Sequence, residues 1–374
     1  MDTGAQWRIS PYPDGHPFAF TIVHDADSAY SRRLAPLFAA FDELHFKITA
    51  TAFMFWADWA RHGAIWSEWM STDSAEARWR APMAVPMEVP QEAEFYLDLA
   101  ARGHELGLHT PSETSSPRVD VVRAFEAFQR LFGALPRIYV EHAAKHNKDA
   151  QDSEGSRLGS PYYNTDLLND SGAWIWVDHW TSLTERQPRF YDVLDGTGSP
   201  FNTAVAEAFG IRNGFVRSGR PRQADGDGFL TWYSREHTLD LARRCGTAIV
   251  YTHLDSAWID PQTRQLRASI RERLAFIASL NPWLVPAGCI LDRFRLFTTL
   301  SLRESEDALV VTNSGDAPVP GVTLIAPAAE LGLRHGARSL LPGPDRRLVI
   351  GDIPARSEMR FQAQRSAGRT ARDA

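Results

Sequence analysis

The residues best suited to chemistry begin with a pair of aspartates, Asp25 and Asp27, that follow an apolar run over residues 18–23. They are two positions apart, so an extended backbone projects both carboxylates from the same side. Two carboxylates placed in this way repel each other, and a bound cation relieves the repulsion. One carboxylate that holds a metal, beside a second that acts as a base, is a workable arrangement for hydrolysis. The alternative is that either aspartate caps the helix that follows.

A histidine and a glutamate form the second candidate group. His109 lies near the end of the segment GHELGLHT over residues 103–110, and Glu113 follows four residues later. That spacing brings both side chains toward one point if the loop coils by a helical turn. The glycines of the segment predict a sharp turn from a preceding helix into a short strand. The pattern therefore predicts a metal site at a strand end.

Three further histidines stand near the ends of expected strands. His142 and His146 are four residues apart, the spacing of a helical metal-binding pair, and incidental histidines on a surface loop are the alternative. His253 follows the apolar run 248–251 and precedes Asp255. A satisfied core histidine is the usual interpretation of one such residue. The position of His253 at a strand end beside an acidic residue favours a functional role.

In their order along the chain, the acidic pair, GHELGLHT at 103–110 and IVYTH at 249–253 resemble the polysaccharide deacetylase family with the NodB homology domain. In that family one aspartate is the general base, a second aspartate and two histidines hold a divalent metal, and a late histidine is the general acid. The resemblance implies that Asp25 is the base, that Asp27 and His109 are metal ligands, and that His253 is the acid. It extends over roughly residues 18–295 by the expected placement of strands.

The chain departs from the family's motifs at several positions. Glu113 stands where the family has its second histidine ligand, and glutamate binds the same metals through oxygen. The alternatives are that His142 or His146 completes the coordination, or that Glu113 faces solvent and the metal is lost. Arg137 is the residue that could match the arginine of the third motif. The segment 174–180 resembles the fourth motif, which supplies an aspartate and an aromatic wall, and this implies substrate contacts for three residues: Trp176, Asp178 and Trp180.

Alternating strands and helices must position these residues. Apolar runs predict strands at 18–23, 47–53, 105–108, 137–141, 173–177, 228–233 and 247–251. Helical periodicity predicts helices at 31–44, 91–102, 119–132, 237–244 and 264–280. After residue 296, short strands without helical period predict a small antiparallel β-sandwich. We therefore expect an α/β fold with a distorted (β/α)7-type, NodB-like barrel over 1–296, a β-sandwich domain over 297–364 and a disordered tail over 365–374.

Composition limits the class of protein and its partners. The chain has 374 residues, 44% of them hydrophobic, which suffices for one large domain and a small one. Its net charge of -6, mixed along the sequence, argues against a nucleic-acid partner. Its two cysteines make no disulfide framework. A signal-peptide pattern and a long apolar run are both missing from the sequence, so we expect a cytoplasmic protein with no transmembrane segment. The oligomeric state stays open.

Together these patterns predict a metal-dependent hydrolase of carbohydrate amides, a de-N-acetylase acting on an N-acetylated sugar or glycan. Its cofactor would be one divalent ion, zinc first, with cobalt, nickel, iron or manganese also compatible with mixed oxygen and nitrogen ligands. Two alternatives stand beside this hypothesis. One is a catalytically silent carbohydrate-binding or scaffold protein that has lost the metal. The other is an enzyme that cleaves an ester or a non-sugar amide.

Overall fold

The structure, a computed structural model, covers most of the chain. It describes residues 6–27, 30–57, 64, 67–68, 71, 84–142, 147–176, 191–192, 201, 207–215, 226–254, 257–305 and 308–365. Four residues of the sequence hypothesis lie outside the described residues, namely His146, Asp178, Trp180 and Asp255. The same holds for residues 366–374, which make up almost all of the expected tail.

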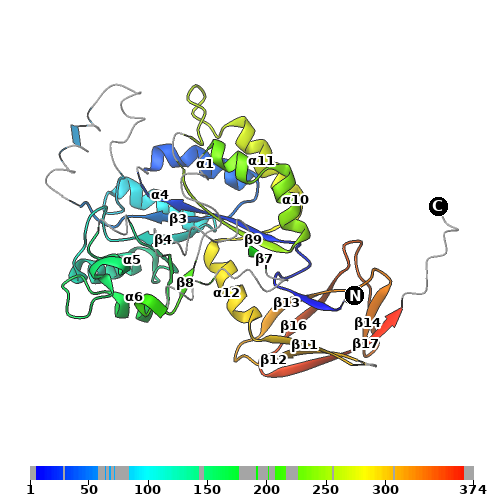
Figure 1. Ribbon diagram of the computed structural model, residues 1–374. Coiled ribbons are helices and arrows are strands. Elements are labelled where there is room, and N and C mark those ends of the chain that lie inside the picture. The colour runs from blue at the N-terminus through cyan, green and yellow to red at the C-terminus, as the bar shows by residue number, and fades with distance from the viewer. Residues whose placement is uncertain are drawn as a thin grey trace.

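Seven parallel strands form the sheet at the centre of the N-terminal part (Figure 1). In spatial order they are β9 (Gly246–His253), β2 (Ala19–Asp25), β3 (Thr49–Ala52), β4 (Glu105–His109), β5 (Ile138–Val140), β6 (Trp174–Trp176) and β8 (Gly214–Phe215). Two short strands extend the sheet: β7 (Tyr191–Asp192) pairs antiparallel with β9, and β10 (Trp283–Leu284) pairs with β2. Over the described residues the path of strands stays open between β7 and β8. The expected distorted barrel is confirmed.

Helices lie against the outside of this curved sheet (Figure 1). Five of them confirm the helical periodicity: α1 (Ser31–Glu43), α4 (Pro90–Ala101), α5 (Arg118–Phe132), α10 (Arg235–Arg243) and α11 (Ala268–Ser279). Three helical elements lie where the sequence pattern predicted neither a helix nor a strand: the π-helical turn η1 (Gln151–Gly155), α6 (Thr165–Ser171) and α12 (Ala287–Phe297). Strand β2 is buried at all seven positions, as expected for a strand covered on both faces.

The strand expected at 228–233 is wrong, because these residues form helix α9 (Asp227–Trp232) and its C-cap. Aromatic and threonine residues gave the segment a high strand propensity. In the structure Phe229 and Tyr233, four residues apart, are both buried, and their ring centroids lie 5.3 Å apart. That spacing places both rings on one helical face, and packing on this face overrides the local propensity.

Two antiparallel sheets make up the C-terminal part and confirm the expected sandwich. The first contains β1 (Arg8–Ser10), β13 (Val319–Ile325) and β16 (Arg347–Ile353). The second contains β11 (Leu300–Glu304), β12 (Leu309–Asn313), β17 (Ser357–Arg365), β14 (Leu331–His335) and β15 (Arg338–Leu340). Side chains from both sheets share one buried apolar cluster.

The N-terminal strand β1 belongs to this sandwich and not to the barrel. It pairs antiparallel with β13, so the chain begins in one unit, builds the barrel and returns to the same unit. The buried guanidinium of Arg293 on α12 ties these segments together, donating to the backbone oxygens of Pro11 and Pro320. Among the described helices, none combines the length and the apolar character needed to cross a membrane.

Candidate metal centre

The candidate residues meet where three parallel strands end. Asp25 ends β2, His109 ends β4 and His253 ends β9. The carboxyl ends of parallel strands share one edge of a sheet, and α/β folds hold their ligands there. Strands β2 and β9 pair with Asp25 opposite His253. Strand order therefore brings together side chains that lie far apart in the sequence.

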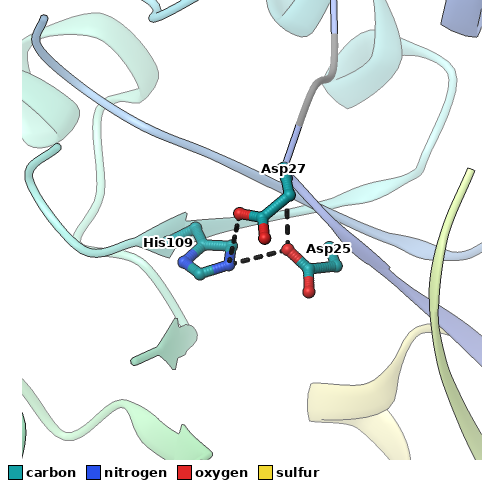
Figure 2. Close-up of side chains that lie close together, drawn as sticks. All are labelled: Asp25, Asp27 and His109. Atoms are coloured by element: carbon teal, nitrogen blue, oxygen red, sulfur yellow. Dashed lines mark hydrogen bonds and ion pairs between the residues drawn. The ribbon is translucent and has the colours of Figure 1, made fainter. Parts of the chain in front are cut away.

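Asp25 contacts two imidazoles at once. Its Oδ1 lies 2.8 Å from His109 Nε2, and its Oδ2 lies 3.0 Å from His253 Nε2. Asp27 lies beside it, with Oδ1 3.8 Å from His109 Nε2 and Oδ2 3.6 Å from His253 Nε2. The backbone N–H of Asp27 donates to Asp25 Oδ1 at 3.1 Å, which holds the two aspartates in one turn. Figure 2 shows both carboxylates close to the same ring nitrogen of His109.

Asp25, Asp27 and His109 form a group that can hold a metal ion. One ligand atom from each residue lies within 4.8 Å of the other two. Asp25 and His109 are buried, and Asp27 is partly exposed. Two carboxylates and an imidazole are a donor set that suits zinc and its neighbours in the first transition row. The residues present therefore fit the implied ion.

The two carboxylates are ionised at neutral pH. Burial opposes the ionisation of Asp25, but the charge and the hydrogen bond of His109, and then those of His253, hold its pKa well below the usual range. Burial and the charge of Asp25 likewise oppose the ionisation of Asp27, yet contacts with His142, His253 and His109 bring its pKa to about 2. Metal ligands must be deprotonated, and this condition is met for both aspartates.

His142 is a second imidazole at the same centre. Its Nε2 lies 3.2 Å from Asp27 Oδ1, and its ring centroid lies 5.3 Å from that of His109. Phe53 stacks on His109 at 4.7 Å and meets His142 edge-on at 5.4 Å. Burial lowers the pKa of His142, but the hydrogen bond and charge of Asp27, followed by the charge of Asp25, raise it to about 9. His142 is therefore protonated at neutral pH in this arrangement.

Glu113 points elsewhere. Its Oε1 accepts a hydrogen bond from the backbone N–H of Ala84 at 2.9 Å, and it does not join Asp25, Asp27 and His109 in the metal-capable group. The backbone oxygen of Glu113 lies 3.5 Å from Asn147 Nδ2. Of the two described candidates for the missing ligand, His142 lies at the centre and Glu113 ties two loops together.

The backbone around His109 explains the glycines of its segment. Gly103 adopts φ +88°, so the chain turns from α4 into β4 through a conformation that favours glycine. A Cβ on Gly107 would lie 3.1 Å from both the Ile138 oxygen and Thr51 Cγ2, so glycine gives β3 and β5 room to approach β4 closely. Thr110 has φ +48°, a strained value for a β-branched residue, and its hydroxyl bonds the His109 oxygen at 2.8 Å. The local chain is thus held to present His109.

Arg137 lies at the opposite end of the barrel. It precedes β5, and its guanidinium contacts Glu105, the first residue of β4, and Asp292 on α12. The structure does not bring it to the metal centre. Trp176 ends β6 on the same edge as the centre, but its indole is buried and stacks on Tyr251, with centroids 4.1 Å apart.

The sequence hypothesis gave no role to two residues that lie at the centre, His24 and Phe53. His24 precedes Asp25, and its Nδ1 accepts the backbone N–H of Leu254 at 3.3 Å, which links the end of β2 to the residue after His253. Burial lowers the pKa of His24 most, and the charges of His253 and His109 lower it further. The charge of Asp25 raises it, but the result is a pKa of about 3. Its position beside the acidic pair was a usable signal. Phe53 gave none, because an aromatic residue in a strand is usually part of the core.

Comparison with known proteins gives matches only among solved structures. No family model and no curated protein matches the chain. A Mycobacterium smegmatis protein described as a polysaccharide deacetylase is 15% identical, with 79% of this chain and 97% of that chain covered and a TM-score of 0.40. PuuE allantoinase is 11% identical, with coverages of 79% and 95% and a TM-score of 0.44.

A third match is a mutant of a CE4-family pseudoenzyme with restored enzymatic activity. It is 11% identical, with 75% of this chain and 70% of that chain covered and a TM-score of 0.37. At such identities and TM-scores these structures carry no inference about the chemistry of this chain, which we take from its own side chains. The matches include a protein described as a polysaccharide deacetylase, the family that the sequence resembles.

Proposed function

We propose that this protein is a metal-dependent hydrolase of carbohydrate amides, most directly a de-N-acetylase of an N-acetylated sugar or glycan. One observation supports the proposal above the others. Two ionised carboxylates and the imidazole of His109 converge within 4.8 Å, and the imidazole of His253 contacts Oδ2 of Asp25. A metal-capable group joined to an acid–base pair is what amide hydrolysis needs.

Asp27 and His109 would hold the metal, and His142 would be the third protein ligand. When bound, a divalent ion polarises a carbonyl group and lowers the pKa of water. His142 Nε2 lies 3.2 Å from Asp27 Oδ1, which places this imidazole beside a carboxylate of the metal-capable group. Zinc is the ion that we propose first, because imidazole and carboxylate together are among its usual ligands.

Asp25 would act as the general base and His253 as the general acid. Asp25 is ionised and buried, so it can accept a proton from a water molecule at the open side of the centre. His253 has a side chain that is 26% exposed, and its Nε2 faces Asp25 Oδ2. An amine is a poor leaving group until it is protonated, and His253 is placed to supply that proton. Hydrogen bonding to Asp25 also keeps the ring of His253 in place before the transfer.

The test is acetate release from a zinc-loaded protein incubated with N-acetylated oligosaccharides. Variants Asp25→Asn and His253→Ala should each lose about 10²–10⁴-fold in kcat, the range for removal of one acid or base. Asp316→Asn and His335→Ala, both on the exposed surface of the β-sandwich, are the matched controls. Full activity of Asp25→Asn would rule out the assigned base.

The second candidate is a carbohydrate-binding protein without catalysis. Glu113, which occupies the position of a family ligand, bonds a backbone N–H and leaves the centre with one histidine fewer. A wild-type protein that takes up neither zinc nor cobalt, yet binds oligosaccharides in calorimetry, would favour this candidate over the hydrolase.

A further inference from the structure

One ring nitrogen of His142 faces Asp27, and the other faces a buried asparagine, Asn147. Nε2 lies 3.2 Å from Asp27 Oδ1, and Nδ1 lies 3.4 Å from Asn147 Nδ2. The side chain of Asn147 belongs to a residue that is 6% exposed. The ring of His142 is therefore held between the metal-capable group and a buried amide. No step of the proposed hydrolysis uses this amide.

Two backbone oxygens fix the direction of the Asn147 amide. Its Nδ2 donates to the His142 oxygen at 3.0 Å and to the Glu113 oxygen at 3.5 Å. An amide oxygen in the same position would face two carbonyl oxygens, which have no hydrogen to donate. The Asn147 side chain thus joins the residues that follow β5 to the residues that follow β4.

The two residues after Asn147 tie the same parts of the chain together. The backbone N–H of Lys148 donates to Ser115 Oγ at 3.0 Å, and Asp149 Oδ1 accepts the backbone N–H of Ser116 at 3.0 Å. Asp149 and Ser116 are each 2% exposed. Buried hydrogen bonds of this kind rigidify the groups that they join. Residues 147–149 are therefore held in one place against residues 113–116.

The Glu113 backbone oxygen is also an acceptor for His142. Burial lowers the pKa of His142, whereas the carboxylates of the centre and a hydrogen bond to the backbone oxygen of Glu113 raise it. Nδ1 is the ring nitrogen on this side, because Nε2 faces Asp27. A carbonyl oxygen has two lone pairs, so it can accept from His142 Nδ1 and from the Asn147 amide together.

We propose that Asn147 is a positioning residue that sets the ring of His142 for metal binding through Nε2. Metal-bound histidines commonly donate their other ring N–H to a backbone carbonyl, which fixes the tautomer and the orientation of the ring. The Glu113 oxygen would be that acceptor, and the Asn147 amide would hold it beside His142. Residue 113, where the resembled family has its second histidine ligand, would then contribute through its backbone. This inference rests on the proposed function for the role of His142 as a zinc ligand.

The zinc affinity of Asn147→Ala tests the positioning role without relying on turnover. Loss of an outer partner of a ligand weakens metal binding by about 10–100-fold, and we expect a loss of this size in a competition titration with a chelating dye. Ser115→Ala is the matched control, because it removes the acceptor of Lys148 and leaves the contacts of Asn147 in place. The control should keep the wild-type zinc affinity. Equal losses in both variants would show that only the order of the loop matters, and would overturn the positioning role.

A double-mutant cycle tests whether Asn147 acts through His142. In a His142→Gln background the imidazole is gone, so Asn147→Ala should cause no further loss of zinc affinity. A loss as large as that in the wild-type background would overturn the proposal.

The tautomer of His142 can be measured without any variant, in a long-range proton–nitrogen NMR spectrum of the zinc-loaded protein with isotope-labelled histidine. Nδ1 should carry the hydrogen, and Nε2 should carry none. A hydrogen on Nε2 of His142 would overturn the proposal. This measurement stays decisive if Asn147→Ala does not fold.

The outcome separates the positioning role from the hydrolase. Weaker zinc binding by Asn147→Ala, with no acetate released by the wild-type protein from any N-acetylated sugar, supports the positioning role and contradicts the proposed function. Acetate release by the wild-type protein, with equal zinc affinity of wild type and Asn147→Ala, supports the function and contradicts the positioning role.

Discussion

Glu92→Gln should reverse its effect on stability between acid and alkaline pH. Glu92 is 2% exposed and lies in the first turn of α4. Its two oxygens accept hydrogen bonds from the backbone N–H and the hydroxyl of Ser31, both at 2.7 Å. Ser31 begins α1, whose N-cap residue, Tyr30, provides no side-chain capping bond to the helix. Glu92 belongs to α4 but caps the start of α1 at Ser31, four residues after Asp27.

The magnitude follows from the pKa of Glu92. Burial raises this pKa from 4.5 to about 7, against the opposing hydrogen bonds of Ser31. The folded state then holds the proton more tightly than the unfolded state, so the contribution to stability is complete below pH 4.5 and is lost as the pH rises through about 7. At 1.36 kcal/mol per pH unit, this interval corresponds to about 3 kcal/mol.

Glutamine carries no titrating proton but provides one acceptor fewer, at a cost of about 1 kcal/mol. Glu92→Gln should thus be about 1 kcal/mol less stable than wild type at pH 4.5 and about 2 kcal/mol more stable at pH 8.5. Urea unfolding of the metal-free protein at both pH values measures the difference. Glu94→Gln, exposed on the same helix, is the control and should stay within about 0.5 kcal/mol of wild type. Equal pH slopes for wild type and Glu92→Gln would refute the reasoning.

Four further predictions concern the centre and its support. Zinc affinity should rise up to about tenfold per pH unit from pH 7 toward 9, because His142 must lose its proton to become a ligand. In a zinc titration, His142→Gln should flatten this rise. An unchanged slope in the variant would contradict the role of His142 as a zinc ligand. Glu113→Gln should keep the wild-type zinc content in elemental analysis, since the Glu113 carboxylate accepts a hydrogen bond from the backbone of Ala84. Loss of zinc in this variant would show that Glu113 is a ligand. Gly107→Ala should lower the free energy of unfolding in urea by about 1–3 kcal/mol through overpacking, and an unchanged value would show that β4 has room for a Cβ. Arg137→Gln should leave kcat unchanged and lower the free energy of unfolding by about 1–3 kcal/mol, because its partner Glu105 stays buried without its ion pair. A lower kcat with an unchanged free energy of unfolding would instead place Arg137 at the active site.

The sequence predicted the barrel because its signals are local and repeated. Apolar runs such as that of β2 and the periodicity of α5 depend on which face a residue buries, and the structure follows both. The prediction for residues 228–233 was wrong, since Phe229 packs on Trp258 and Tyr233 packs on Phe20 of β2, and the local pattern does not reveal these contacts. The pairing of β1 with β13 was equally inaccessible, because three residues joined to a strand more than 300 positions away have no local signature.

The candidate centre could be predicted in part. Asp25, Asp27, His109 and His253 each follow an apolar strand, and parallel pairing is sufficient to bring such strand ends together. Whether Glu113 or His142 lies beside Asp27 depends on how two loops fold after their strands, which spacing alone does not determine. Arg137 was assigned by order in the chain, yet it precedes its strand and so lies at the other end of the barrel.

The most direct test of the metal centre is elemental analysis of protein reconstituted with zinc and then desalted. Wild type and the control Asp316→Asn should hold close to one zinc ion per chain, and Asp27→Asn and His109→Ala should lose most of it. A wild-type protein that binds no zinc, or variants that keep all of it, would contradict a metal held by these two residues.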